Sequence, residues 1–232
     1  MAAGKKYTGA GIPTHYECSL HGLLAKDHEP QLRTRLEALC GDTEAAHREL
    51  HHEVSCIPCV ETPVGPLRRE DHVLRLRIEL DPEDPLCAEK STSSICLLGH
   101  PEPRSGRGAS VRPIINAQVL SGSSSASQLL SLLGYKFNSE FVRKGYWFLY
   151  RSSLKVVVSQ IYRLEKQGDV QSAAPVDPSG NWVVQIVSEA MSQELVPRVC
   201  DQLEELKGLL DDYVELLVVD HAFLENKIPY ST

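Results

Sequence analysis

One stretch of the chain, residues 134–164, constrains the possible fold more than any other. It concentrates aromatic and β-branched side chains, and in residues 154–164 these alternate with more polar ones. An alternation with a period of two is typical of a strand that buries one face. Upstream, residues 135–142 and 146–150 are short aromatic segments separated by residues 143–145, where a glycine permits a turn with positive φ. The stretch therefore predicts a three-stranded antiparallel meander.

Composition narrows the class of protein. The chain has 232 residues, 42% of them hydrophobic, and a formal net charge of −7. This is enough to bury one core, and the clustered Lys and Arg that bind phosphates directly in nucleic acids are absent. No apolar run reaches the ~20 residues that span a bilayer, and the first residues lack the apolar stretch of a signal peptide, so we expect a soluble intracellular protein. The seven cysteines are scattered and odd in number, which favours free thiols over disulfides.

The rest of the chain reads as many short strands with a few helices. We expect a disordered tail over residues 1–13 and a single domain over 14–232, in the α+β class. Helices are predicted near residues 30–40, 128–133 and 197–212, and residues 121–127 read as a low-complexity linker. Pro113 shifts its strand toward a sheet edge or a bulge. The other predicted strands cover residues 16–20, 54–60, 72–80, 94–98, 111–120 and 182–187.

The strand over residues 72–80 has two different faces. Arg75, Arg77 and Glu79 alternate on one face, while leucine and isoleucine occupy the other. We expect the apolar face to be the buried one, and the strand to form a hairpin with residues 54–60. The charged row fits either a polar sheet face with cross-strand charge pairs or the lining of a tunnel.

Residues 134–148, GYKFNSEFVRKGYWF, and the strand end IYRL at 161–164 resemble the subunit 18 family of the Mediator complex. The order of elements at residues 16–40 and in the C-terminal strand and helix is similar too. The resemblance implies an antiparallel β-barrel, like that of the triphosphate-tunnel enzymes, with a few flanking helices. It also implies a nuclear, non-enzymatic subunit of the Mediator head module that pairs with subunit 20 and binds the C-terminal helix of subunit 8. Such a subunit links regulators to the RNA polymerase II initiation machinery.

Catalytic and metal-binding alternatives find little support. Triphosphate-tunnel enzymes hold a divalent metal with alternating glutamates on the first strand, but here Glu17 is followed by Ser19. Cys56 and Cys59 form a CxxC, yet no second ligand pair follows at zinc spacing, and the pair lies in a predicted strand rather than at a helix start. We therefore predict no catalytic residue, cofactor or metal. A residual triphosphate-binding or phosphohydrolase barrel, and a barrel adaptor outside Mediator, remain as alternatives.

The aromatic strand supplies the candidates for partner binding. Tyr146, Phe148 and Tyr150 share one of its faces and Trp147 and Leu149 share the other, so both faces are apolar. A barrel wall between interior and solvent needs only one apolar face. The second face is then covered by a partner or by the C-terminal helix of the chain itself. The partner-binding candidates are Trp147, Leu149, Phe148 and Tyr146, and the pattern does not say which face is inner.

Overall fold

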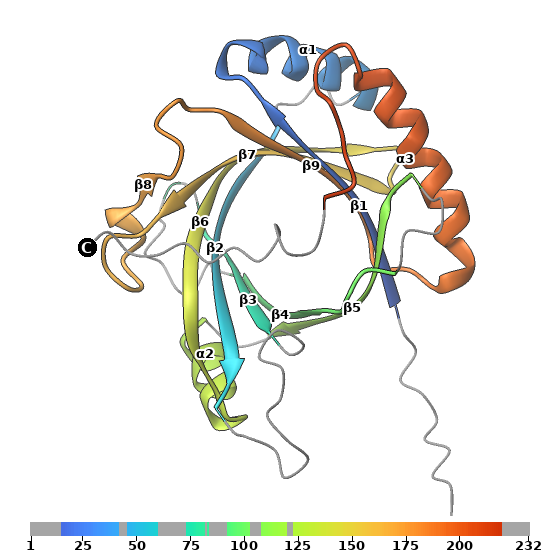
Figure 1. Cartoon of the computed structure of the whole chain (residues 1–232). Coiled ribbons are helices and arrows are strands. Elements are labelled where there is room, and N and C mark those ends of the chain that lie inside the picture. Colours follow the sequence, from blue (N-terminus) through green and yellow to red (C-terminus); the bar gives the residue numbers. More distant parts are fainter. Residues whose placement is uncertain are drawn as a thin grey trace, which may run out of the picture.

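Antiparallel strands close into a barrel in the computed structural model (Figure 1), which describes residues 15–41, 46–59, 73–81, 83, 92–102, 108–119 and 123–219. The sheet order is β6-β2-β3-β4-β5-β1-β9-β7-β8, and pairing of β6 with β7 closes eight of these strands into a ring. The α+β class and the antiparallel barrel are thus confirmed. The strands are β1 (His15–Leu24), β2 (His47–Pro58), β3 (Leu74–Glu79), β4 (Thr92–Leu98), β5 (Ser110–Val119), β6 (Tyr135–Tyr150), β7 (Leu154–Arg163), β8 (Ala174–Pro175) and β9 (Trp182–Ser188).

Three α-helices pack against the outside of this ring (Figure 1). They are α1 (Glu29–Cys40), α2 (Ser123–Leu132) and α3 (Val196–Leu210), with short 3-10 turns at η1 (Lys26–His28), η2 (Val170–Ser172) and η3 (Gln193–Leu195). α1 ends where Gly41, at φ 66°, donates its N–H to the carbonyl of Glu37. α3 begins with Pro197 in its first turn, where the missing N–H costs nothing. The predictions for α1 and α3 are confirmed.

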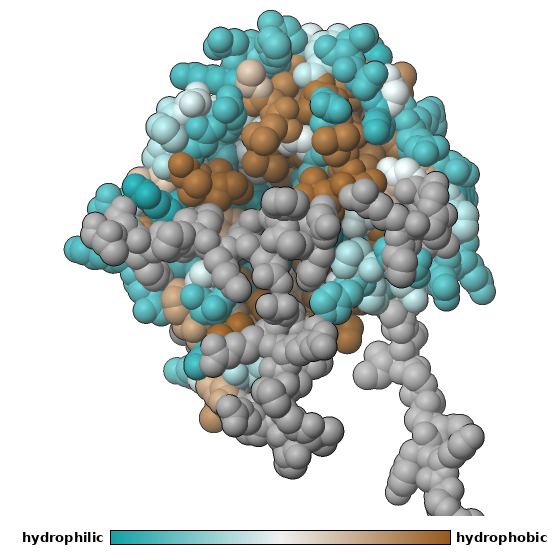
Figure 2. All heavy atoms as spheres, viewed as in Figure 1, coloured by the Kyte–Doolittle hydropathy of each residue, from teal (hydrophilic) through white to brown (hydrophobic). Residues whose placement is uncertain are grey.

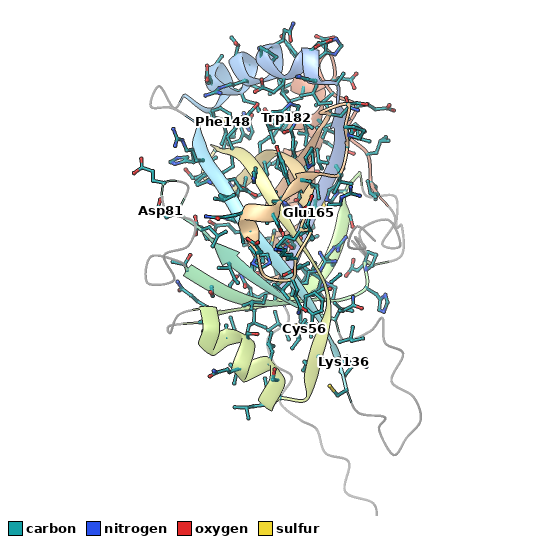
Figure 3. All side chains as sticks on the ribbon, turned by 90° about the vertical axis from the view of Figure 1, so that its left-hand side faces the viewer. Cys56, Asp81, Lys136, Phe148, Glu165 and Trp182 are labelled. Atoms are coloured by element: carbon teal, nitrogen blue, oxygen red, sulfur yellow. The ribbon has the colours of Figure 1, made fainter. Side chains whose placement is uncertain are left out.

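The hydrophobic core lies outside the barrel lumen, between the outer wall and the helices. One cluster joins the strands to α1 and α3 and includes Leu20, Phe148 and Leu203. The second lies under α2 and includes Leu76 and Cys56. Figure 3 shows Phe148 near α1 and Cys56 near α2, at opposite ends of the molecule. The apolar face of β3 is therefore buried, as predicted, because it is the outer face that α2 covers.

The predicted meander is wrong in one respect. Residues 135–150 form a single strand, β6, that runs through the expected turn at 143–145. β6 pairs with β2 on one side and β7 on the other. Gly145 is needed for space instead of a turn, since a Cβ there would lie 2.1 Å from the carbonyl oxygen of Val158. The chain reverses later, where Arg151 and Ser152 have φ values of 48° and 54°.

Three smaller expectations also change. Pro113 lies inside a closed wall, with β5 paired to both β4 and β1, rather than at an edge. Its carbonyl accepts from Gly99 just after β4, so its missing N–H falls at the end of that neighbouring strand. The serine-rich run that reads as a linker forms the first turns of α2, which begins at Ser123. β2 begins at His47, seven residues before the predicted start, and pairs with β3 as the expected hairpin. The expected tail at 1–13 lies outside the described residues.

Closure of the barrel at Gly145 can be tested with alanine. Gly145→Ala places a methyl group against the backbone of β7, and we expect a loss of about 2 kcal/mol or more in the free energy of unfolding. Gly208→Ala is the matched control, because Gly208 lies in α3 with nothing within 4 Å of its added Cβ. There, alanine should stabilise the protein by about 0.5–1 kcal/mol through its helix propensity. Urea unfolding of both variants measures the difference, and equal effects would contradict this account of Gly145.

The burial of Phe148 gives a second test. Its side chain is 1% exposed within the core under the helices, so Phe148→Ala should cost about 3–5 kcal/mol of unfolding free energy. The neighbouring Leu149 faces the opposite way and is 38% exposed, so Leu149→Ala should cost about 1 kcal/mol or less. Denaturant unfolding monitored by tryptophan fluorescence compares them. A similar loss in both variants would show that the two faces of β6 are equally packed.

Candidate functional site

The lumen of the barrel contains a polar cavity of about 460 Å³. It exists because the residues that alternate with the outer apolar wall point inward, and here several of them are charged. The segment after α3 closes in on one end of it, where His21 and Leu217 form an antiparallel bridge. Its polar lining comes from β1, β3, β5, β6, β9 and that segment: Glu17, Ser19, His21, Arg75, Arg77, Arg112, Arg143, Gln185 and Glu215.

Glu53 lies close to two cations in the lumen. Its carboxylate is 3% exposed and lies 3.3 Å from Nη2 of Arg143 and 3.7 Å from Nε of Arg77. Burial alone would raise the pKa of Glu53, but the guanidinium groups of Arg143 and Arg77 outweigh it and lower the pKa to about 2. Glu53 is therefore ionised at any physiological pH and ties β2 to β3 and β6.

Glu49, on the same face of β2 four residues before Glu53, forms a second ionic contact. Its Oε2 lies 3.2 Å from Nζ of Lys155 on β7. Nζ of Lys155 in turn lies 4.7 Å from the ring centroid of Trp147, whose other neighbour is the ring of His47, stacked at 4.1 Å. A cation above an indole is attracted by the negative face of the ring. Trp147 is thus part of the inner wall, held between a cation and an imidazole.

On the side of the lumen formed by β1 and β5, the buried charges have fewer partners of opposite sign. Arg112 is 2% exposed, and its Nε and Nη2 have no hydrogen-bond partner among the described residues. Glu17 stands opposite Arg112 in the β1–β5 register, and burial raises the pKa of Glu17 despite the attraction of Arg77 and Arg112. Burial, together with Arg112 and Arg143, lowers the pKa of His21 to about 4, so this imidazole is neutral at pH 7.

The arrangement does not suit metal catalysis. Glu17 and Ser19 both line the cavity, so the position that would carry a second carboxylate carries a hydroxyl. Within the described part of the chain, no group of three or more His, Cys, Asp or Glu side chains could hold a metal ion. The two cysteines of the CxxC lie in different environments, because Cys56 is buried under α2 and Cys59 is exposed.

Among the helices of the described residues, none has both the length and the apolar character needed to span a membrane.

The structure separates the four predicted partner-binding residues. Tyr146 and Phe148 belong to the core, and the hydroxyl of Tyr146 donates to Glu29 of α1 at 2.7 Å. The chain's own helices therefore cover this face, with α1 in contact with β6, whereas the competing explanation names the C-terminal helix. Trp147 and Leu149 lie on the lumen face, and Leu149 is 38% exposed. Any contact of these residues with a partner stays a prediction.

Sequence reasoning missed much of the inner wall. Arg143 was assigned to a turn, and Glu49, His51 and Glu53 fell before the predicted start of β2. Their spacing of two residues is a strand signal, but Arg48 and His52 at the intervening positions interrupt the alternation between polar and apolar residues. Arg75 and Arg77 line the cavity, as the tunnel-lining interpretation predicts, but Glu79 is not among its lining residues. Arg77 also pairs with Glu53 across the β2–β3 register, as the alternative of cross-strand charge pairs predicts.

Two groups of exposed apolar side chains are candidates for partner binding. Leu23 and Leu217, at one end of the cavity, are 73% and 49% exposed, and Figure 2 shows apolar atoms gathered at this end of the barrel. On α2, Leu132 and Leu133 are 86% and 60% exposed, with Leu129 at 43% one turn earlier. Exposed groups of this kind mark surfaces that bind other proteins.

Two of the lumen carboxylates, Glu53 and Glu17, should respond differently to removal of their charge. Glu53→Gln leaves two half-buried guanidinium groups without their anion and should cost about 3–5 kcal/mol of unfolding free energy at pH 7. Glu17→Gln should cost nothing or stabilise the fold, because burial already disfavours the ionised form of Glu17.

The lowered pKa of Glu53 also predicts how the free energy of unfolding depends on pH. The pKa of Glu53 is about 2 in the folded chain and 4.5 ordinarily, so its contribution of about 3 kcal/mol is present above pH 5 and is lost as the pH falls toward 2. The difference in unfolding free energy between the wild type and Glu53→Gln should therefore shrink with acidification. A difference that stays constant from pH 7 to pH 3 would contradict the ion pairs.

The family described as Med18 protein matches residues 16–227 of the chain. Mediator of RNA polymerase II transcription subunit 18 from Arabidopsis thaliana is 27% identical over 185 residues, which are 76% of this chain and 75% of the plant protein. A chain in the structure of the Schizosaccharomyces pombe Mediator head module is similar with a TM-score of 0.68 and 20% identity, covering 88% of this chain and 98% of that one.

The barrel itself is shared more widely. The triphosphatase of the Mimivirus capping enzyme superimposes with a TM-score of 0.50 at 7% identity, over 88% of this chain and 92% of the viral one. This likeness shows a common barrel architecture, while the match over residues 16–227 identifies the family. The chain therefore belongs to the Med18 family of nuclear, non-catalytic Mediator subunits.

Proposed function

We propose that the chain acts as the subunit 18 of a Mediator head module, where it is a structural link between regulators and the RNA polymerase II initiation machinery. The observation that carries this proposal is the family match, which extends over residues 16–227 and so includes the barrel and all three helices. The similarity to nearly the whole length of a head-module chain supports it.

The interior chemistry supports a role that does not involve catalysis. Glu53 and Glu49 lie close to cations on β3, β6 and β7, so they hold the barrel together instead of activating a substrate. With the second carboxylate replaced by Ser19, a divalent metal would have Glu17 as its one carboxylate on β1. The function then depends on exposed surfaces that can bind partners.

The partners follow from the family resemblance: subunit 20 and the C-terminal helix of subunit 8. Two surfaces are candidates for them. The first is the leucine row of α2, Leu129, Leu132 and Leu133, because an apolar row on one helix face is what a facing helix or sheet covers. The second is the exposed part of the inner wall at Leu149, next to Trp147.

Coexpression with subunit 20 tests the proposal. The two chains should elute together from gel filtration as a stoichiometric complex, and adding the C-terminal helix of subunit 8 should give a ternary complex. Leu132→Glu, on a side chain that packs against nothing, should preserve folding and weaken assembly by about 2 kcal/mol or more if α2 is the contact. Trp147→Ala makes the same test for the inner wall.

Leu195→Glu is the control, because Leu195 is exposed to 47% in η3, away from both candidate surfaces. Its assembly should match that of the wild type. A chain that elutes as a stable monomer and ignores both partners would contradict the proposed function. If both Leu132→Glu and Trp147→Ala assemble normally, the interface lies on neither candidate surface.

A further inference from the structure

An open groove lies on the outside of the barrel wall, between the start of α1 and the loop that leads from β8 to β9. Its volume is about 660 Å³, within the range of ligand sites. Gln160 and Tyr162 of β7, which line it, continue the outer row of Val156 and Val158, so the groove is separate from the lumen. Figure 3 shows Trp182, another lining residue, near α1.

Two aromatic rings line the groove, and neighbouring groups hold them in place. The hydroxyl of Tyr162 donates to Oε1 of Gln160 at 3.0 Å, and Nε2 of Gln160 donates to the carbonyl of Gly180 at 2.8 Å. The ring centroid of Trp182 lies 5.9 Å from that of Tyr146, which belongs to the core. Both lining rings are half-buried. A ligand that packs on such fixed rings loses little binding energy to the ordering of side chains.

Three prolines complete the apolar part of the groove. Pro30 lies in the first turn of α1, Pro175 ends β8, and Pro178 follows in the loop toward β9. Proline has a fixed φ and few side-chain rotamers, so these walls are rigid as well. Grooves that combine aromatic rings with a rigid apolar surface bind extended, proline-containing segments.

The charges that line the groove are mostly negative. Its described lining residues include three carboxylates, Asp27, Glu29 and Asp177, and one ammonium group, that of Lys26. The backbone N–H of Ser179 donates to Asp177 at 2.8 Å and lowers the pKa of this carboxyl, so Asp177 is ionised at pH 7. The groove therefore complements a ligand that carries positive charge.

Trp182 is the ring on which an added cation fits. Nζ of Lys144 already lies 4.4 Å from the ring centroid of Tyr162. Among the described residues, no cation lies over the ring of Trp182. A guanidinium group stacks on an indole and presents paired donors to carboxylates, whereas an ammonium group is a compact and strongly hydrated charge. Arginine therefore suits this position better than lysine.

We propose that the groove binds an extended segment of a partner protein that contains arginine and proline, with the guanidinium group on the ring of Trp182. Asp27 and Asp177 balance its charge. Lys26 opposes binding, because its side chain lies beside the groove residue Gly180, where an added Cβ would be 3.3 Å from Cδ of Lys26. This inference goes beyond the proposed function, since no groove residue belongs to the two surfaces considered for subunits 20 and 8.

The test is isothermal titration of the full chain at low salt with the acetylated peptide Pro-Arg-Pro-Pro-Arg-Pro. Two peptides of the same length, with lysine or glutamate in place of arginine, are titrated beside it. The arginine peptide should bind several-fold more tightly than the lysine peptide, and the glutamate peptide should not bind. The affinity of the arginine peptide should fall as salt is added, because the carboxylates are exposed to screening.

Three variants change the groove without disturbing the core. Asp27→Asn should weaken binding of the arginine peptide at least threefold, and Trp182→Phe should weaken it by a similar factor, because a phenyl ring attracts a cation less than an indole does. Lys26→Met should tighten binding several-fold by removing the opposing charge. Lys26 and Asp27 are both exposed, so their variants should keep the Tm of the wild type.

Asp201→Asn is the matched control, since it makes the same change at an exposed carboxylate of α3, outside the groove, and should leave the affinity unchanged. The proposal is overturned if the arginine peptide does not bind, if it binds no better than the glutamate peptide, or if Asp27→Asn and Asp201→Asn lose affinity equally. It is also wrong if the arginine peptide fails to bind while Trp182→Phe releases the subunit 8 helix from the ternary complex, because that helix would then occupy the groove. These titrations use the chain alone, so a failure of assembly with subunit 20 does not affect them.

Discussion

Closure of the barrel by the β6–β7 pairing is the constraint on which the rest of the structure depends. β6 is 16 residues long and pairs with β2 along one side and with β7 along the other, so the ring has no open side there. Once the ring is closed, every strand residue points either into the lumen or toward the outside. The outer apolar set then needs helices to cover it, and the inner polar set needs charges of both signs.

The distribution of charge in the lumen follows from this geometry. Glu53 and Glu49 both lie on β2, while their cationic partners come from β3, β6 and β7. The contacts thus link β2 to its two neighbours and, across β6, to β7, and they are specific to one register, because a shift by one residue would point these side chains outward into the apolar wall. Buried ion pairs add little net stability compared with apolar packing, but a buried charge without a partner is strongly destabilising. The ion-pair network therefore disfavours other strand registers more than it raises the stability of the native one.

The sequence predicts the outer wall well and the inner wall poorly. The Leu32–Leu36 spacing and the apolar face of residues 74–80 predict α1 and β3, because local periodicity reflects burial against a single neighbour. Gly145 misleads, since glycine at a turn and glycine at a close approach of two strands look alike in a sequence. β2 is missed over residues 47–53 because its inner residues are charged, and their partners are up to 106 positions away along the chain, as between Glu49 and Lys155.

The candidate site is limited by the same problem. That Glu17 and Ser19 share one inner face can be predicted from their spacing, and the structure places both in the cavity. The unsatisfied position of Arg112 cannot be predicted, because it depends on where Glu53 and Glu17 fall relative to three other arginines in the folded ring. The balance of charges that face the lumen depends on how all the strands of the closed barrel come together, and it cannot be derived from any single strand.

A closed ring also determines how partners can bind. A protein with an open sheet edge can bind a partner whose strand pairs with that edge. The main-chain hydrogen bonds of such a pairing do not depend on the identity of the side chains. Within the described residues, each of the eight strands of the ring pairs with two others, so Pro113 marks no edge, and only short stretches such as residues 135–141 of β6 and 115–119 of β5 pair with a strand on one side alone. Most of the surface open to recognition is therefore made of side chains: the leucine row of α2, the exposed wall at Leu149, or the rim at Leu23 and Leu217. Side-chain surfaces are read residue by residue, which makes such an interface selective for its partners and sensitive to single substitutions.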